Sequence, residues 1–363
     1  MRYNALAALA LATLAAPATA ENCPQIADLE ILDKHCASTD RGLVIADSAE
    51  RAGILISLAE SGASNFEAMF GRPPAHYVIV ERTEGGLSDS EREALKDAGY
   101  AAILPWLSPQ GFRNQMTESV RRAFDASASM LDDSQRELAW QSALAQLESR
   151  VSDKAAEDRD RTAIPHELGH MWLIHAFWPN SLAMPGGHYG GPGPDWLDEL
   201  AAVLHEPDEA SAQRRRHFGE RYLAIRLAMA RNETVTDELL DLKAYLTKAH
   251  PVGGNPQELL AQTPGGPNIG GATIRVLTGP EAQRVAGDGI RFYLQSRLFA
   301  DYILHRSGKP VIFGTIAGAM AENPDFGLWL AAHGDKNGLP AAIDELEDDW
   351  LEWLAEIYPV EAI

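Results

Sequence analysis

The chain has 363 residues, of which 45% are hydrophobic and 23% charged, as in a globular protein rather than a disordered or fibrous one. Its formal net charge is −21 at pH 7, and so acidic a surface repels phosphate backbones and anionic lipid headgroups. We therefore expect neither nucleic acid nor a membrane as a partner. The oligomeric state stays open.

The first twenty residues have the pattern of a secretory signal peptide. Arg2 gives a basic start, an apolar run covers 5–16, and 18–20 (Ala-Thr-Ala) forms a small-x-small cleavage signal. The apolar run is shorter than the roughly 20 residues that span a bilayer, which argues against a membrane anchor. We expect cleavage after Ala20, a mature chain from Glu21, and a periplasmic or extracellular location.

Cys23 and Cys36 are the only cysteines, and both closely follow the expected cleavage point. Because export places them in an oxidising compartment, we predict a disulfide between them. Two unpaired thiols are the alternative. A zinc site would need further ligands, and only His35 is close in sequence.

The first third of the chain has a mixed pattern. Apolar residues at helical spacing predict a helix over 43–70, which 71–74 (Gly-Arg-Pro-Pro) would end. Runs of strand-forming residues at 76–80 and 101–104 predict two strands. We expect strands only in this part.

Beyond residue 112 the pattern is mostly helical, interrupted by Gly/Pro-rich loops at 185–194 and 251–271. The segments with helical spacing are 133–153, 163–178, 195–206, 209–231 and, as several helices, 292–353.

Residues 166–170, His-Glu-Leu-Gly-His, form an H-E-x-x-H motif. On a helix, positions i and i+4 share one face, so His166 and His170 can ligate one metal ion. Glu167 lies about 100° round the helix, where it can reach a water on that ion without binding the ion itself. This pattern suits zinc, which acidifies a bound water, with Glu167 as the base.

The residues around the motif favour a helix. Thr162 can cap its start, Pro165 suits a first turn, and Pro179 would end it. Chance remains an explanation for so short a motif, and a third ligand is needed to strengthen it.

Three residues compete as third ligand. His175 does not fit the metzincin pattern, which needs a glycine and a histidine where Leu173 and Ala176 stand. His188 lies in a Gly/Pro loop, which holds a metal less rigidly than a helix does. Glu199 is preferred, since two histidines and a glutamate with an open water position form a known catalytic zinc set.

Glu199 lies in a short predicted helix that Asp195 would cap and Pro207 would end. H-E-x-x-H followed by Trp-Leu-x-Glu on a second helix resembles the gluzincin zinc metallopeptidases, the clan of thermolysin and aminopeptidase N. Asp198 and Leu200 stand where that clan commonly has Asn and Gly, and the gap between the helices is longer. In thermolysin an aspartate four residues after the glutamate ligand supports the site without binding the metal, but Val203 stands at that position here. Asp195 and Asp198 are therefore the candidate hydrogen-bond partners for the histidines.

A further segment, from Phe292 onward, is similar to the part of aminopeptidase N-like enzymes that carries a catalytic tyrosine. The resemblance implies that Tyr293 donates a hydrogen bond to the oxyanion of the tetrahedral intermediate. An ordinary packed aromatic residue is the alternative.

Other residues receive no catalytic role. Residues 318–323 superficially resemble an exopeptidase motif, but we expect a helix that Asn323-Pro324 ends. His205 and Glu206 close the Glu199 helix and could form hydrogen bonds near the site. The remaining histidines, His76, His217 and His333 among them, are expected to be surface or structural residues and not ligands. Trp172, Trp196, Trp350 and Trp353 are expected in the core.

Together these patterns predict a predominantly helical α+β enzyme with a zincin-like domain over 21–363, divided into a mixed part (21–125) and a helical part (126–363). The expected activity is zinc-dependent hydrolysis of peptide bonds. The alternatives are a zinc hydrolase of a non-peptide amide or ester and a non-catalytic zinc protein that binds peptides. Endopeptidase and aminopeptidase activity both stay open, although the lack of an exopeptidase motif before His166 weakens the second, and the residue preference is open as well.

Overall fold

The computed structural model describes most of the chain, namely residues 19–21, 23–26, 28–29, 33–128, 132–180, 192–235, 239–247, 268–269, 272–273 and 279–360. Residues 1–18 of the expected signal peptide and His188 lie outside these ranges. Within them, no helix combines the length and the apolar character needed to cross a membrane.

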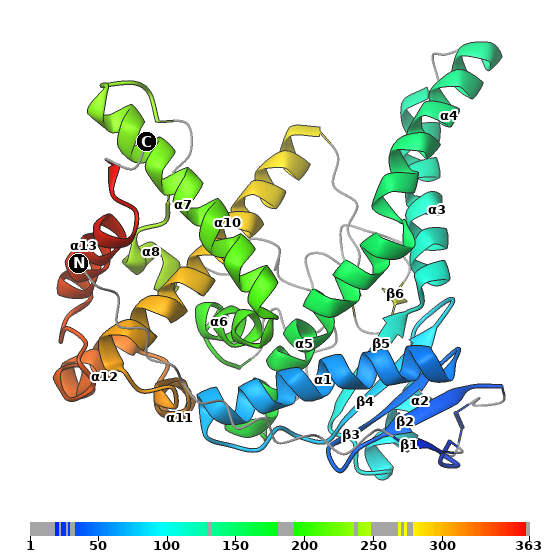
Figure 1. The fold of residues 1–363 in the computed structure, drawn as a ribbon, viewed down its shortest axis with the longest axis horizontal. Helices are drawn as coiled ribbons and strands as arrows, with labels where there is room; N and C mark the ends of the chain where they lie inside the picture. Colours follow the sequence, from blue (N-terminus) through cyan, green and yellow to red (C-terminus); the bar gives the residue numbers. More distant parts are fainter. Residues whose placement is uncertain are drawn as a thin grey trace.

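The predicted class is confirmed, because helices dominate and strands are few (Figure 1). The strands are β1 (Thr19–Glu21), β2 (His35–Ser38), β3 (Gly42–Ala46), β4 (Tyr77–Arg82), β5 (Ala102–Leu107), β6 (Asn268–Ile269) and β7 (Ala272–Thr273). The first helices are α1 (Ala49–Phe70), α2 (Asp89–Asp97), α3 (Pro109–Ser127), α4 (Asp133–Arg150), α5 (Asp153–Phe177) and α6 (Asp195–His205). The later ones are α7 (Asp208–Ala230), α8 (Leu242–Thr247), α10 (Gly279–Ser307), α11 (Ile312–Glu322), α12 (Phe326–His333) and α13 (Ile343–Ile357).

Strands β1 to β5 form one mixed sheet in the order of the sequence. β1, β2 and β3 pair antiparallel, whereas β3, β4 and β5 pair parallel. The two strands predicted from sequence are β4 and β5, each slightly longer than expected. β1 spans the expected cleavage point between Ala20 and Glu21.

The predicted helix over 43–70 is wrong at its start, because residues 42–46 form strand β3. Every residue of β3 is buried, as in strands that are covered on both faces, and so it reads as a continuous apolar run. Such a run has no period that separates it from a buried helix. The helix begins only after Ser48, whose side chain accepts a hydrogen bond from the backbone N–H of Arg51.

The expectation that strands occur only in the first third is also wrong. β6 and β7 form a small antiparallel pair, and β6 lies within the predicted loop 251–271. Each strand is two residues long, which is too short to leave a periodic signal. The predicted boundary at residue 125 falls inside α3, and the division of the chain at that point stays a prediction.

Two apolar clusters cover the two faces of the sheet. On one face, side chains such as Val44 and Ile79 pack in the main cluster with residues of α1 and α5. On the other face, Ile45 and Val80 pack with Leu95 of α2. The predicted disulfide between Cys23 and Cys36 is present beside this second cluster, with the two Cα atoms 5.1 Å apart.

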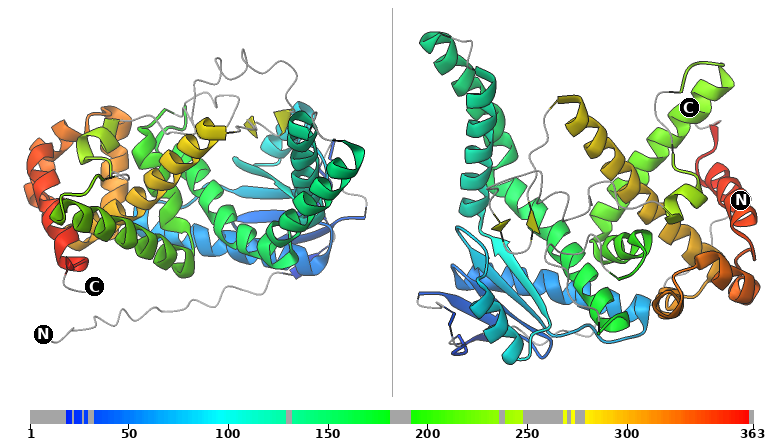
Figure 2. Two further views of the ribbon diagram at one scale, coloured as in Figure 1. Left: turned by 90° about the horizontal axis from the view of Figure 1, so that it is seen from above. Right: turned by 180° about the vertical axis from the view of Figure 1, so that it is seen from behind.

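The helical layers place α5 and α6 at the centre of the molecule, with α1 next to α5 and α10 next to α6 (Figure 1). Helices α3 and α4 project as a pair from the sheet, as the view from behind shows (Figure 2). The tryptophans expected in the core are buried, and His76, His217 and His333 are exposed. α11 ends with Asn323 as its C-cap, as predicted.

Candidate metal centre

The motif helix α5 begins well before the predicted cap Thr162. Its N-cap is Ser152, whose side chain accepts a hydrogen bond from the N–H of Ala155. The stretch after it, Asp-Lys-Ala-Ala-Glu-Asp-Arg-Asp-Arg, is so charged that it carries little apolar periodicity, which explains the missed start. Pro165 therefore lies inside the helix, where it has no N–H to donate to the carbonyl four residues earlier.

Two glycines let neighbouring helices approach the motif. A Cβ on Gly62 of α1 would lie 2.9 Å from the Pro165 side chain. A Cβ on Gly169, within the motif, would lie 3.1 Å from the Cα of Ala202 in α6. The lack of a side chain at Gly169 therefore allows α6, which carries Glu199, to pack closely on α5.

The structure brings His166, His170 and Glu199 together. All three are buried, and one potential ligand atom from each lies within 4.8 Å of the others. The Nε2 of His166 is 3.6 Å from Oε1 of Glu199, and the Nε2 of His170 is 3.9 Å from Oε2. Two imidazole nitrogens that face one carboxylate in this way could hold a metal ion, and this donor set suits zinc.

The other nitrogen of each imidazole faces a second carboxylate. The Nδ1 of His166 is 3.0 Å from Oε1 of Glu206, and the Nδ1 of His170 is 2.9 Å from Oδ1 of Asp198. A carboxylate at Nδ1 holds the proton there and leaves Nε2 free to ligate, as in known metal sites. The pattern of contacts therefore fits a metal ion on both histidines.

Of the two aspartates expected as partners, Asp198 is at hydrogen-bond distance from His170, whereas Asp195 is the first residue of α6 and not its cap. The N-cap is Pro194, which forms no side-chain cap. The sequence assigns Glu206 no catalytic role but allows hydrogen bonds near the site, and Glu206 forms them with His166 and Arg214. Glu206 follows Glu199 by seven residues, which is two helical turns along one face, and this spacing was the available signal.

Arg214 of α7 completes the contacts of Glu206. Its Nε donates to Oε2 of Glu206 at 2.5 Å, and a second nitrogen donates to Oε1. Burial alone would raise the pKa of Glu206, but hydrogen bonds from Arg214 and His166 outweigh it and lower this pKa to about 2. Glu206 is thus charged near neutral pH and accepts the hydrogen bond of His166.

The buried charges act strongly on one another. Burial disfavours a charged His166, but the carboxylates of Glu199 and Glu206 outweigh it and raise the pKa of His166 to about 9. Burial raises the pKa of Glu199 to about 8, with Asp198 and Glu206 adding to the effect. Burial and the charge on His166 lower the pKa of His170 to about 3.

Glu167 and Tyr293 both lie at this cluster. Glu167 is half-buried on α5, and its charge acts on both His166 and His170. The ring of Tyr293, from α10, lies edge-on to the ring of His166 with centroids 5.9 Å apart. The rival ligand His175 is exposed near the end of α5 and does not belong to the buried group.

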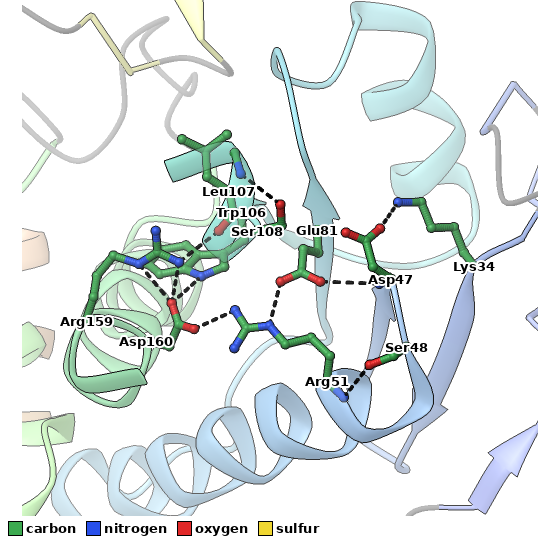
Figure 3. Close-up of polar contacts among 11 residues, drawn as sticks. Lys34, Asp47, Ser48, Arg51, Glu81, Trp106, Leu107, Ser108, Arg159 and Asp160 are labelled. Atoms are coloured by element: carbon green, nitrogen blue, oxygen red, sulfur yellow. Dashed lines mark hydrogen bonds and ion pairs between the residues drawn. The ribbon is translucent and has the colours of Figure 1, made fainter. Parts of the chain in front are cut away.

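Anchors on both sides of the motif hold α5 in place. Before it, Asp160 accepts a 2.8 Å hydrogen bond from the Trp106 indole, and its other oxygen pairs with Arg51 at 2.5 Å (Figure 3). Arg51 in turn pairs with Glu81 at the end of β4, at 2.6 Å. After the motif, the Trp172 indole donates to the carbonyl of Ala75 at 3.1 Å. These contacts fix both halves of the helix against the sheet and its connections.

Comparison of the chain with protein-family models, with curated proteins and with solved structures found no match.

Proposed function

We propose that this chain is a zinc-dependent peptidase of the gluzincin type. The observation that carries the proposal is the orientation of His166 and His170, whose Nε2 atoms both face Glu199 while their Nδ1 atoms face carboxylates. The two histidines and one glutamate found together among the described residues are a donor set of known catalytic zinc sites, which keep a further position for water. Helices α1 and α5 on one face of a mixed sheet support a zincin-like fold.

In this proposal His166, His170 and Glu199 hold the zinc, which would acidify a water and polarise the substrate carbonyl. Glu167 takes the proton of the water as its oxygen attacks the carbonyl carbon. The same carboxyl then passes the proton to the leaving amine as the carbon–nitrogen bond breaks. The Tyr293 hydroxyl donates a hydrogen bond to the oxyanion, a role that its place beside His166 supports.

The N-terminal sequence and the disulfide support an exported enzyme that acts in the periplasm or outside the cell. We propose a peptide or protein as the substrate. A non-peptide amide or ester would use the same residues, so a panel of unstructured proteins, blocked and unblocked peptides, and simple esters separates these possibilities and also endopeptidase from aminopeptidase activity.

The test begins with the metal content of the purified protein and chelator-sensitive hydrolysis. We expect about one zinc per chain, and loss of most of it in Glu199→Ala. Glu167→Gln should keep the zinc and lose turnover by several orders of magnitude. His217→Ala, which removes an exposed histidine of α7, is the control and should keep both. Full activity in Glu167→Gln, or no zinc in the wild type, would reject the proposal.

A further inference from the structure

Among the contacts of the described residues, Arg214 is the α7 residue that reaches the candidate metal centre, where it contacts two side chains. It donates two hydrogen bonds to Glu206, and its guanidinium carbon lies 5.3 Å from the centroid of the Tyr293 ring. Both partners face the same imidazole, since Glu206 accepts from His166 and the Tyr293 ring lies edge-on to it. A single guanidinium therefore contacts the carboxylate behind a metal ligand and the aromatic ring beside it.

We propose that Arg214 is a positioning residue that sets the orientation of His166 and of Tyr293 together, so that metal binding and oxyanion stabilisation depend on the same side chain. The part that concerns Tyr293 rests on the proposed function. The part that concerns His166 requires only that the cluster binds zinc.

The contact with Glu206 explains how Arg214 would act on the metal ligand. The Glu206 side chain is fully buried, and an isolated carboxylate there would be strongly disfavoured. The two parallel hydrogen bonds from the planar guanidinium fix both carboxylate oxygens, which a single ammonium group cannot do. Oε1 is then held where the Nδ1–H of His166 can donate to it, so that Nε2 faces Glu199.

The contact with Tyr293 explains how the same side chain would act on turnover. A guanidinium above an aromatic face is attracted by the ring and restricts its orientation. Tyr293 has two rotatable side-chain bonds, and a tilt of its ring would move the hydroxyl away from the oxyanion. The same guanidinium is hydrogen-bonded to Glu206 and so cannot easily shift. It can therefore hold the Tyr293 ring in one orientation.

The neighbouring Arg215 provides a matched control. It lies on the same helix and pairs with a carboxylate in the same two-point manner, but that carboxylate is Asp301 of α10, at 2.7 and 2.9 Å. Loss of Arg215 therefore removes a two-point ion pair of the same helix, although a more exposed one, without touching Glu206 or Tyr293.

The experiment compares the full mature chain with Arg214→Met, Arg214→Lys, Arg215→Met, Tyr293→Phe and the double variant Arg214→Met/Tyr293→Phe. Zinc affinity is measured by competition with a chromophoric chelator, and kcat and KM with the best peptide of the panel. We expect Arg214→Met to weaken zinc binding by roughly 10- to 100-fold, Arg214→Lys to restore part of it, and Arg215→Met and Tyr293→Phe to leave it unchanged.

For turnover we expect Arg214→Met, saturated with zinc, to lower kcat with little change in KM. Arg214→Met should lower kcat much less in the Tyr293→Phe background than in the wild type, because the tyrosine hydroxyl that Arg214 orients is already absent there. Should Arg214→Met fold poorly, Arg214→Lys and the rescue of Arg214→Ala by added guanidinium ion provide the same two readouts.

Zinc affinity in Arg214→Met equal to that of Arg215→Met would overturn the positioning of His166. Additive kcat losses in the double variant would overturn the positioning of Tyr293. A wild-type chain that binds zinc but hydrolyses nothing would reject the proposed function, and with it the Tyr293 part, while the zinc affinities still decide the His166 part.

Discussion

The ring of His205 lies directly over Gly169, where a Cβ would come within 2.5 Å of the His205 Cδ2 atom. Gly169 is one of the two variable positions of the H-E-x-x-H motif, and His205 is the last residue of the helix that carries Glu199. The close contact between them sets the distance from α5 to α6. The ligands of one helix are thereby within reach of the ligand of the other.

We expect Gly169→Ala to push the two helices apart and to cost about 1–3 kcal/mol of unfolding free energy, as overpacked cores do. The same change should weaken zinc binding, because Glu199 moves away from both histidines. Urea unfolding and chelator competition measure the two effects. The control is Gly53→Ala on α1, where a Cβ meets nothing within 4 Å and stability should rise by up to about 1 kcal/mol. Equal behaviour of the two variants would contradict the prediction.

His205 also makes stability depend on pH. Burial first, and then the charges of His166, His170 and Arg297, lower the pKa of His205 to about 3, below its ordinary value of 6.5. Its ring packs instead against Phe66, Phe70 and Trp172. Below pH 6.5 the unfolded chain gains a proton that the folded chain does not, so this residue lowers stability as pH falls from about 6.5 to 3.

The variant His205→Phe, which keeps an aromatic ring, isolates that effect. Relative to the variant, the wild type should lose up to about 1.4 kcal/mol of unfolding free energy per pH unit below pH 6.5. Unfolding by urea at a series of pH values, with chelator present, gives both curves. Parallel pH curves for the two proteins would show that His205 is not held neutral.

Asp198→Asn tests the carboxylate behind His170. An amide in its place can accept a hydrogen bond but carries no charge, so we expect zinc binding to weaken by roughly 10- to 100-fold with the fold intact. Chelator competition and thermal unfolding are the measurements. Asp208→Asn, in the exposed first turn of α7, is the control and should bind zinc as the wild type does.

Asp160→Asn tests the anchor of α5 before the motif. Asp160 is 1% exposed and pairs with Arg51, which keeps Glu81 as a partner in the variant, so loss of this buried charged contact should cost about 1–3 kcal/mol. We expect a loss of this size in urea unfolding. Asp153→Asn is the matched control, because that carboxylate is 88% exposed and its pair with Arg113 should contribute less than about 1 kcal/mol. A loss below that level in Asp160→Asn would show that the anchor contributes little.

The sequence allowed prediction of what depends on local spacing. The two histidines of the motif lie four residues apart on one helix, and Glu199 follows in a short amphipathic one, so all three could be named in advance. The disulfide followed from the number of cysteines and the expected export. The strands β4 and β5 followed from runs of β-formers between breakers.

What escaped prediction depends on contacts between distant segments. Arg214 lies on a separate helix, and nothing in its neighbourhood in sequence ties it to Glu206. The true start of α5 was hidden because its first turns are charged and are held by Asp160, whose partners Arg51 and Trp106 come from elements far earlier in the chain. Such contacts leave no periodic trace in a single sequence.

Helices α1 and α2 pack on opposite faces of the sheet, and this fixes the relative handedness of the two connections that contain them. β3, β4 and β5 follow one another in the same direction across the sheet, yet the first connection passes over one face and the second over the other. The two crossovers must therefore be of opposite hand, although about 98% of such connections are right-handed. Had the second matched the first, α2 would cover β5 on the face where Ala102 and Leu104 now pack with Ile164 and Leu168 of α5. The uncommon crossover thus leaves the position beside β5 open for the helix that carries both histidines.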